Sequence, residues 1–175
     1  MKRILVPALA FTVVATGAAC GSEDSADPPP PTTTSPTAAD EEALRDLAEG
    51  WFEASRRIGI DGESPSLADQ YLTAEYLTGF KDEIARRDSA GEAVVGDPQG
   101  RSSNFVESIE VSGDEAQIVQ CIVDADVLIR AADGSSLDDS VSAKRFESQA
   151  VETPSGWRFT SRSTVDEWED QTECD

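Results

Sequence analysis

The chain has 175 residues, and its 35 acidic against 14 basic side chains give a formal net charge of −21. This acidity argues against nucleic-acid binding, which relies on Lys and Arg, and favours a well-solvated surface, with a calcium-binding surface as the alternative. Histidine is absent, so Ser-His-Asp and Cys-His nucleophile activation are excluded, and Asp and Glu remain the ordinary bases near neutral pH.

Residues 1–19 have the pattern of a signal peptide. Lys2 and Arg3 form a basic start, and a mostly apolar run follows from Ile4 to Ala18. The run is shorter than the roughly 20 residues that a membrane-spanning helix needs. It ends in small residues, as a signal peptide does before its cleavage site. We therefore expect residues 1–19 to be removed on export.

The segment Gly17-Ala18-Ala19-Cys20-Gly21 resembles the lipobox of bacterial lipoproteins. In that family the cysteine receives a diacylglycerol, and a dedicated peptidase cuts just before it. Gly17 departs from the family, which usually has an aliphatic residue there. The resemblance implies that Cys20 is lipidated and that acyl chains such as palmitate hold the protein to the outer face of the cell membrane. An ordinary secretory signal is the alternative, because the same residues satisfy the small-x-small rule.

The segment from residue 20 to residue 39 is rich in Pro and Thr, including Pro28–Pro31 and Thr32–Thr34. It lacks the apolar surface needed to offset its ordering entropy, which predicts a disordered linker. Residues 40–175 then form a single folded domain, a size that supports a hydrophobic core.

A helix is predicted at the start of the domain. Thr37 and Asp40 fit a capping box, apolar residues recur every three or four positions from Leu44 to Ile58, and Gly59 is placed as the C-cap. A second helix is expected from Ser64-Pro65, because Pro is favoured in the first turn.

Thr73 is expected to cap a third helix that ends near Arg87. Residues 88–103 are rich in Gly, Ser and Asp and are interpreted as a loop with at most one short strand at Val94-Val95.

Beyond Ser103 the apolar period changes from 3.6 to 2, which predicts strands. Phe105 and Val111 are assigned to one face of the first strand, together with Ile109. The following strands are expected at Ala116–Arg130, Val141–Val151 and Trp157–Val165, with turns between them. Helices followed by an antiparallel meander predict an α+β fold, in which the N-terminal helices pack on a curved antiparallel sheet of about four strands.

The long strand has apolar residues on both faces. One face is expected to meet the helices: Val119, Cys121, Val123, Val127 and Ile129. Ile118, Ile122 and Leu128 would then point outward and need a cover. A homodimer through the outer sheet face is one solution. The alternatives are a C-terminal segment with Trp168 folded over that face, or an inverted face assignment.

Three short segments resemble the cone-shaped nuclear-transport-factor-two-like fold: Tyr71-Leu72-Thr73, Cys121-x-x-Asp124 and Gly156-Trp157-Arg158-Phe159. The resemblance covers residues 40–165 and includes the cystatin-like arrangement of helices on a curled sheet. This fold is common among exported lipoproteins of high-GC Gram-positive bacteria. Its members include enzymes, ligand binders and scaffolds, so the resemblance does not select a function. Its enzymes generally use an Asp and often a His inside the cone, and this chain has no His.

The chain has three cysteines. If Cys20 is acylated, Cys121 and Cys174 remain as a pair for a disulfide in an oxidising compartment. Two free buried thiols are the alternative.

Two aspartates are the candidates for chemistry. Asp124 and Asp126 lie two positions apart on a predicted strand and would point the same way, so they could share a proton or bind calcium. A strand end emerging into solvent is the alternative. The segment 133–139 lacks the order of a calcium loop and is interpreted as a hairpin turn. The other candidate pocket residues are aromatic, and Trp51 is also typical of a core anchor: Trp51, Tyr71, Tyr76 and Phe80.

The sequence therefore predicts an exported, lipid-anchored surface protein whose domain is non-catalytic and binds a protein partner or a small apolar ligand. No metal or cofactor is expected. The alternative is an acid/base enzyme of the isomerase or dehydratase type that uses Asp124 or Asp126.

Overall fold

The computed structural model describes residues 37–174. The predicted signal peptide, the lipidation site at Cys20 and most of the predicted linker lie outside these residues.

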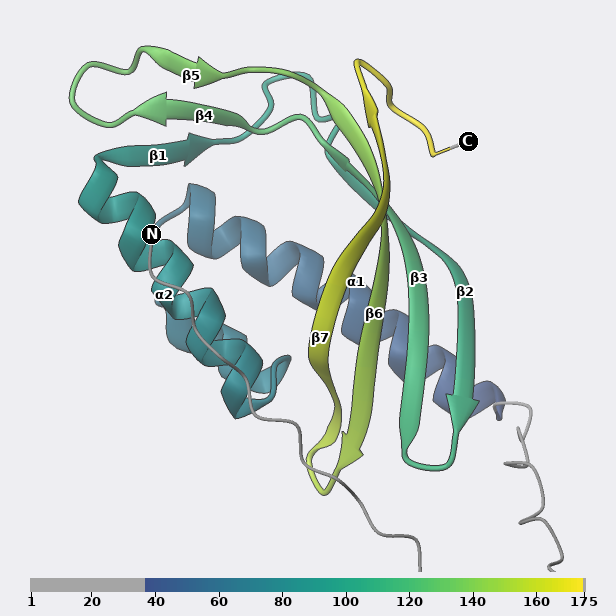
Figure 1. Cartoon of the computed structure of the whole chain (residues 1–175). Helices are drawn as coiled ribbons and strands as arrows, with labels where there is room; N and C mark the ends of the chain where they lie inside the picture. The colour runs from purple at the N-terminus through teal and green to yellow at the C-terminus, as the bar shows by residue number, and fades with distance from the viewer. Residues whose placement is uncertain (1–36, 175) are drawn as a thin grey trace, which may run out of the picture. The chain divides into compact units, whose positions relative to one another are not determined.

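The described chain begins with helices and continues with strands, as predicted (Figure 1). The helical elements are α1 (Ala38–Ile60), the 3-10 helix η1 (Pro65–Gln70) and α2 (Ala74–Ala90). The strands are β1 (Glu92–Val95), β2 (Ser103–Ser112), β3 (Glu115–Asp124), β4 (Val127–Arg130), β5 (Ser136–Asp138), β6 (Ser142–Thr153) and β7 (Gly156–Glu169).

The helix ends follow the local sequence in part. Thr73 directly precedes α2 as expected, but its side chain makes no capping hydrogen bond, and α2 runs three residues past Arg87. Thr37 and Asp40 form the predicted capping box. Helix α2 ends at Gly91, whose φ of 69° is a left-handed conformation that glycine adopts without strain. Gly59 was wrongly predicted as a C-cap: α1 continues to Ile60, and Asp61 caps it through its backbone N–H.

Two antiparallel sheets form the β part of the fold. The larger sheet has the strand order β2-β3-β6-β7, and the smaller one has the order β1-β4-β5. Figure 1 shows the small sheet above α2 and the C-terminal end of α1. The α+β prediction with a curved antiparallel sheet is confirmed, whereas the small sheet was not foreseen beyond the strand at Val94-Val95.

The predicted long strand from Ala116 to Arg130 is in fact two strands. Strand β3 ends at Asp124 and pairs with β2 and β6, whereas β4 begins at Val127 and pairs with β1 and β5. Between them the side chain of Asp126 binds the side chain of Arg56 in α1 and the backbone N–H of Asp97. These contacts hold the segment between β3 and β4 away from the large sheet.

The predicted faces of β3 are inverted. Ile118 is 0% exposed and belongs to the core beneath α1, together with Ala116. Because side chains alternate along a strand, Val119 and Cys121 point to the outer face. The apolar stripe that suggested a homodimer therefore faces the helices.

A β-bulge in β2 shows that the predicted faces of this strand were also wrong. The pairing of β2 with β3 shifts between Val106 and Ser108, so the alternation changes phase there. Val106 is 8% exposed and packs in the core, whereas Phe105 is 67% exposed. Phe105 and Val111 therefore do not share a face.

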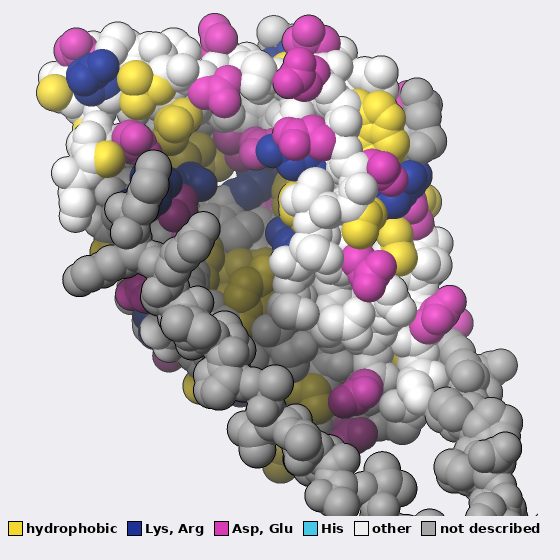
Figure 2. All heavy atoms as spheres, in the orientation of Figure 1, with side chains coloured by type: hydrophobic (Ala, Val, Ile, Leu, Met, Phe, Trp, Pro, Cys, Tyr) yellow, Lys and Arg dark blue, Asp and Glu magenta, His cyan; other side chains and the backbone are white. Residues whose placement is uncertain are grey.

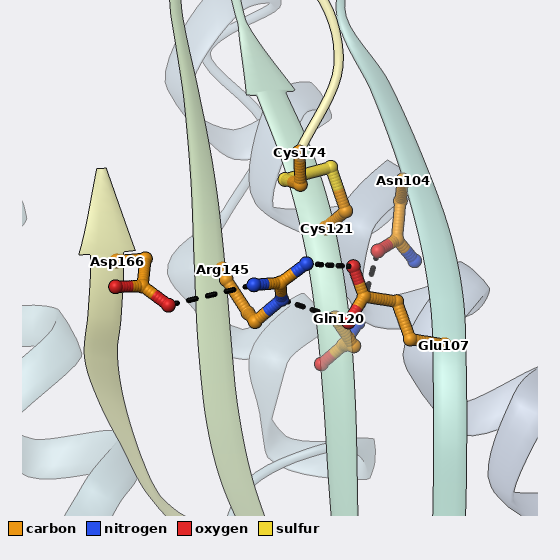
Figure 3. The surroundings of a disulfide bond; sticks show 7 residues. All are labelled: Asn104, Glu107, Gln120, Cys121, Arg145, Asp166 and Cys174. Carbon is orange, nitrogen blue, oxygen red and sulfur yellow. Dashed lines mark hydrogen bonds and ion pairs between the residues drawn. A yellow bond between two sulfur atoms is a disulfide. The ribbon is translucent and has the colours of Figure 1, made fainter. Parts of the chain in front are cut away.

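The C-terminal segment covers part of the outer face. Cys174 forms the expected disulfide with Cys121 of β3, as Figure 3 shows. Beside it Arg145 bridges Glu107 and Asp166 with N···O distances of 2.8 and 3.4 Å. The guanidinium group of Arg145 also lies 5.1 Å from the centre of the Trp168 ring. The outer face is thus closed locally by the chain itself.

Candidate ligand-binding pocket

A pocket of about 500 Å³ opens between α1, α2, the small sheet and the inner face of β3, β6 and β7. Figure 2 shows this hollow in the middle of the visible face. Its apolar wall comes from the helices, the small sheet, β3 and β6: Phe52, Ile60, Phe80, Ile84, Val94, Ile122, Leu128 and Phe146. A hollow of this volume lies in the range of small-molecule sites, which combine apolar walls with polar groups.

Charged side chains line the pocket in equal number. The five basic groups are Arg56, Arg86, Arg87, Lys144 and Arg162. The five acidic groups are Glu83, Glu92, Asp124, Asp126 and Asp138. The lining is therefore formally neutral, although the chain as a whole carries −21.

Glu83 connects two of the arginines on α2. Its carboxylate oxygens accept hydrogen bonds from Arg86 at 2.8 Å and from Arg87 at 2.9 Å. The hydrogen bonds from Arg86 and then from Arg87 lower the pKa of Glu83 to about 2. This carboxylate stays ionised in the physiological range and serves to hold the two arginines.

Asp126 lies between β3 and β4, where the chain passes from the large sheet to the small one. Its oxygens accept hydrogen bonds from Arg56 Nε and Nη2 at 3.0 and 3.1 Å, from the Asp97 N–H at 3.0 Å and from Ser102 Oγ at 2.9 Å. Burial alone would raise the pKa of Asp126, but the bonds from Arg56, Asp97 and Ser102 outweigh it and lower the pKa. Both oxygens of Asp126 are thus occupied by hydrogen bonds from the protein itself, which points to a structural role.

Asp124 differs from Asp126 although only one residue separates them. It accepts one hydrogen bond, from the backbone N–H of Asp126 at 3.3 Å, and within residues 37–174 it has no ion-pair partner at salt-bridge distance. The side chain of Asp124 is exposed to the pocket, but the surrounding walls desolvate it, and this desolvation, followed by the negative charge of Asp126, raises its pKa. Because Asp126 is bound to Arg56, the geometry does not favour a proton shared between the two aspartates.

Arg162 on β7 is the unusual cation of this pocket. Its Nη2 is buried and has no hydrogen-bond partner in the described part of the chain. The guanidinium carbon lies 4.3 Å from the centre of the Phe146 ring, close enough for a cation–π contact. Burial lowers the pKa of Arg162, and Tyr76 partly offsets this effect.

Sequence reasoning missed Arg162 because of a second bulge. Trp157 and Phe159 face the core, so simple alternation along β7 would place Ser161 inside and Arg162 outside. The pairing of β6 with β7 shifts between Gln149 and Ala150, and Arg162 instead pairs with the fully buried Ser148. No residue pattern in the strand signals this shift.

The six pocket residues predicted from the sequence separate into two groups. Phe80, Asp124 and Asp126 line the pocket. Trp51 is 4% exposed and packs in the core, with ring centres 6.1 Å from Tyr71 and 5.0 Å from Phe80. Tyr76 packs against the same core from α2.

The fold and the pocket together define an α+β domain with helices on the inner face of a curved antiparallel sheet and a neutral, partly apolar pocket at one end. Among residues 37–174, no helix has the length and apolar character required to cross a membrane.

Three solved structures resemble this domain. The intermembrane space region of the chloroplast protein ARC6 is 16% identical, covering 70% of this chain and 94% of that one, with a TM-score of 0.59. A conserved protein from Planctomyces limnophilus is 14% identical over 74% of this chain and 100% of its own, with a TM-score of 0.48. A protein of unknown function with a cystatin-like fold from Nostoc punctiforme is 15% identical over 75% and 93%, with a TM-score of 0.42.

No family model and no curated protein matches the chain. At 16% identity the likeness to the ARC6 region concerns the fold alone.

Proposed function

We propose that the chain is an exported lipoprotein, anchored through Cys20, whose domain binds a small molecule with an apolar body without transforming it. The pocket of about 500 Å³ between the helices and the sheet carries this proposal, because it falls within the range of volumes of small-molecule sites. The lipobox-like segment at residues 17–21 supports export and anchoring.

The pocket can be tested by filling it. Gly59 lines the pocket, and a Cβ added there would meet no heavy atom within 4 Å. Gly59→Phe should therefore place a ring in the pocket without a collision at its Cβ. Gly79 on α2 is the matched control, since it is also helical with open space around it and does not line the pocket.

The measurement is native mass spectrometry of the full chain after incubation with a total lipid extract. The unchanged protein and Gly79→Phe should retain the same defined small molecules, and Gly59→Phe should lose them. Equal retention by all three proteins would contradict binding in this pocket. A protein partner bound elsewhere would be equally insensitive to Gly59→Phe.

The anchor can be tested separately. Two acyl chains, at about 0.8 kcal/mol per buried methylene, suffice for stable attachment. Cys20→Ser should release the protein into the medium or leave an uncleaved precursor. A variant that still matures and fractionates with membranes would contradict the lipobox interpretation.

An acid/base enzyme is the second candidate, favoured by the raised pKa of Asp124. A general acid or base works best when its pKa lies near the working pH. Asp124→Asn removes the proton-carrying group but keeps its shape. If the retained molecules include a substrate and product pair whose ratio changes with this substitution, the enzyme proposal replaces the binding proposal.

A further inference from the structure

We propose that the ligand of this pocket carries a single anionic group, a carboxylate or a phosphate ester, which forms an ion pair with Arg162. This inference rests on the proposed function, because it specifies the ligand of the same pocket.

Arg162 differs from the other four basic residues of the lining. Arg56 pairs with Asp126, Arg86 and Arg87 pair with Glu83, and Lys144 pairs with Glu167 at 2.9 Å. In the described part of the chain, Arg162 has no ion pair, and its Nη2 is buried without a partner. The pocket therefore contains one cation that the protein itself does not neutralise.

An unpaired charge that is shielded from water, as on Arg162, is costly. Removing a charged group from water without a partner destabilises the fold. Nearby polar groups avoid this cost: Gln120 is 0% exposed, and it donates to Asn104 at 3.0 Å and accepts from Ser148 at 3.2 Å. The inner face of the sheet thus satisfies Gln120 and leaves Arg162 available for an external partner.

The geometry suits an oxyanion. The Phe146 ring lies 4.3 Å from the guanidinium carbon, while Nη2 remains free to donate. Guanidinium groups bind carboxylates and phosphates through their N–H edge, often with two parallel hydrogen bonds. A ligand with an oxyanion at Arg162 and an apolar body along Phe80 and Ile122 would match the lining.

The charge balance favours a ligand with one anionic group. Five acidic side chains line the same pocket, and Asp124 among them has no ion pair within residues 37–174. Further anionic groups, away from Arg162, would meet repulsion from these carboxylates.

The test compares three probes that share a twelve-carbon chain: dodecanoate, dodecyl phosphate and dodecanol. Their affinities for the full chain are measured by isothermal titration calorimetry. We expect at least one of the two anions to bind about tenfold or more tightly than dodecanol, which is the range of a charge-assisted hydrogen bond. Whichever anion binds more tightly identifies the class of head group.

Three variants assign the effect to Arg162. Arg162→Met keeps an unbranched apolar stem and should abolish the preference for anions while dodecanol binding changes less than about twofold. Arg162→Lys keeps the charge and should retain part of the preference. Arg158→Met is the matched control: Arg158 lies on the same strand, donates to the Asp69 carbonyl and does not line the pocket, so the preference should persist.

The outcomes separate this inference from the proposed function. Equal affinities for dodecanol and both anions, or an anion preference that survives in Arg162→Met, would overturn the role of Arg162. If Gly59→Phe then still blocks all binding, the pocket remains a ligand site for neutral molecules. If no probe binds, both proposals fail for this class of ligand.

Discussion

Asp124 and Asp126 differ in the direction of their pKa shifts, and they therefore change the stability of the fold with pH in opposite directions. The pKa of Asp126 is lowered in the folded protein and that of Asp124 is raised, both relative to a reference value of 3.8. Asp126 therefore contributes stability above about pH 3.8, which is lost as the pH falls. Asp124 does the opposite: its ionisation destabilises the fold as the pH rises above that value.

We expect opposite effects from the two isosteric substitutions at pH 7. Asp126→Asn should reduce the free energy of unfolding by about 2–3 kcal/mol, because it leaves the partly buried Arg56 without its carboxylate. Asp124→Asn should increase this free energy, and the gain should vanish below about pH 3.8. Urea unfolding of the variants and the unchanged chain at pH 3 and pH 7 measures both effects. Equal losses at pH 7 would contradict the distinction.

The residue level is also where the sequence predicted the site least. Asp124 and Asp126 are recognisable as candidates because two carboxylates two positions apart on a strand point the same way. Phe80 is recognisable as an aromatic residue on the apolar side of a predicted helix. Arg162 is not recognisable as a candidate, since its inward direction depends on the pairing shift between Gln149 and Ala150. Such a shift depends on how two strands pack together, and it leaves no mark in the local pattern.

The two long helices contain three glycines, which differ in how closely other side chains approach them. A Cβ at Gly50 would lie 2.7 Å from Cε1 of Tyr71, whereas nothing lies within 4 Å of one at Gly59 or Gly79. Replacing a helical glycine by alanine stabilises by about 0.5–1 kcal/mol when there is room for the methyl group. Only Gly50 supports a close approach between elements.

Gly59→Ala and Gly79→Ala should therefore each stabilise the protein by about 0.5–1 kcal/mol. Gly50→Ala should destabilise it, because Tyr71 would have to move away from its place beside Trp51. Thermal unfolding followed by circular dichroism gives the order of the three variants. A stabilised Gly50→Ala protein would show that the Tyr71 ring moves at little cost.

The elements were predictable where a local signal exists. The capping box at Thr37 and the order of helices before strands follow from short patterns. The break between β3 and β4 does not, because it is caused by contacts of Asp126 with Arg56 and Asp97, which lie far from it in the sequence. The faces of β3 were not predictable either, because both carry apolar residues: one packs in the core and the other is partly covered by the C-terminal segment.

On the scale of the whole molecule, the disulfide joins positions 53 residues apart. A crosslink of this length stabilises by about 4 kcal/mol on the chain-entropy model. The Cys121→Ser, Cys174→Ser double variant should lose stability of this order in urea unfolding. A reducing agent should lower the stability of the unchanged chain and leave that of the double variant unaffected. An equal response of both proteins to the reductant would contradict this account.

Self-association is also decided at this scale. Of the aliphatic stripe that suggested a dimer, Ile118 belongs to the core, and Ile122 and Leu128 line the pocket. A charge of −21 per chain also opposes close approach at low salt. We expect the full chain with Cys20→Ser to sediment as a monomer at both low and high salt. A dimer at high salt alone would point to the outer face around Phe105, which is 67% exposed.

The Cys121–Cys174 bond also determines whether the fragments separate after cleavage by a protease. Between these cysteines lies an exposed stretch, residues 131–140, which a protease could reach. Cleavage there leaves two fragments that the disulfide still joins, and β6 stays paired with β3. A nicked molecule would thus migrate as one species on a non-reducing gel and as two after reduction. With the proposed lipid anchor at Cys20, a single cut in this stretch would leave both fragments attached to the membrane.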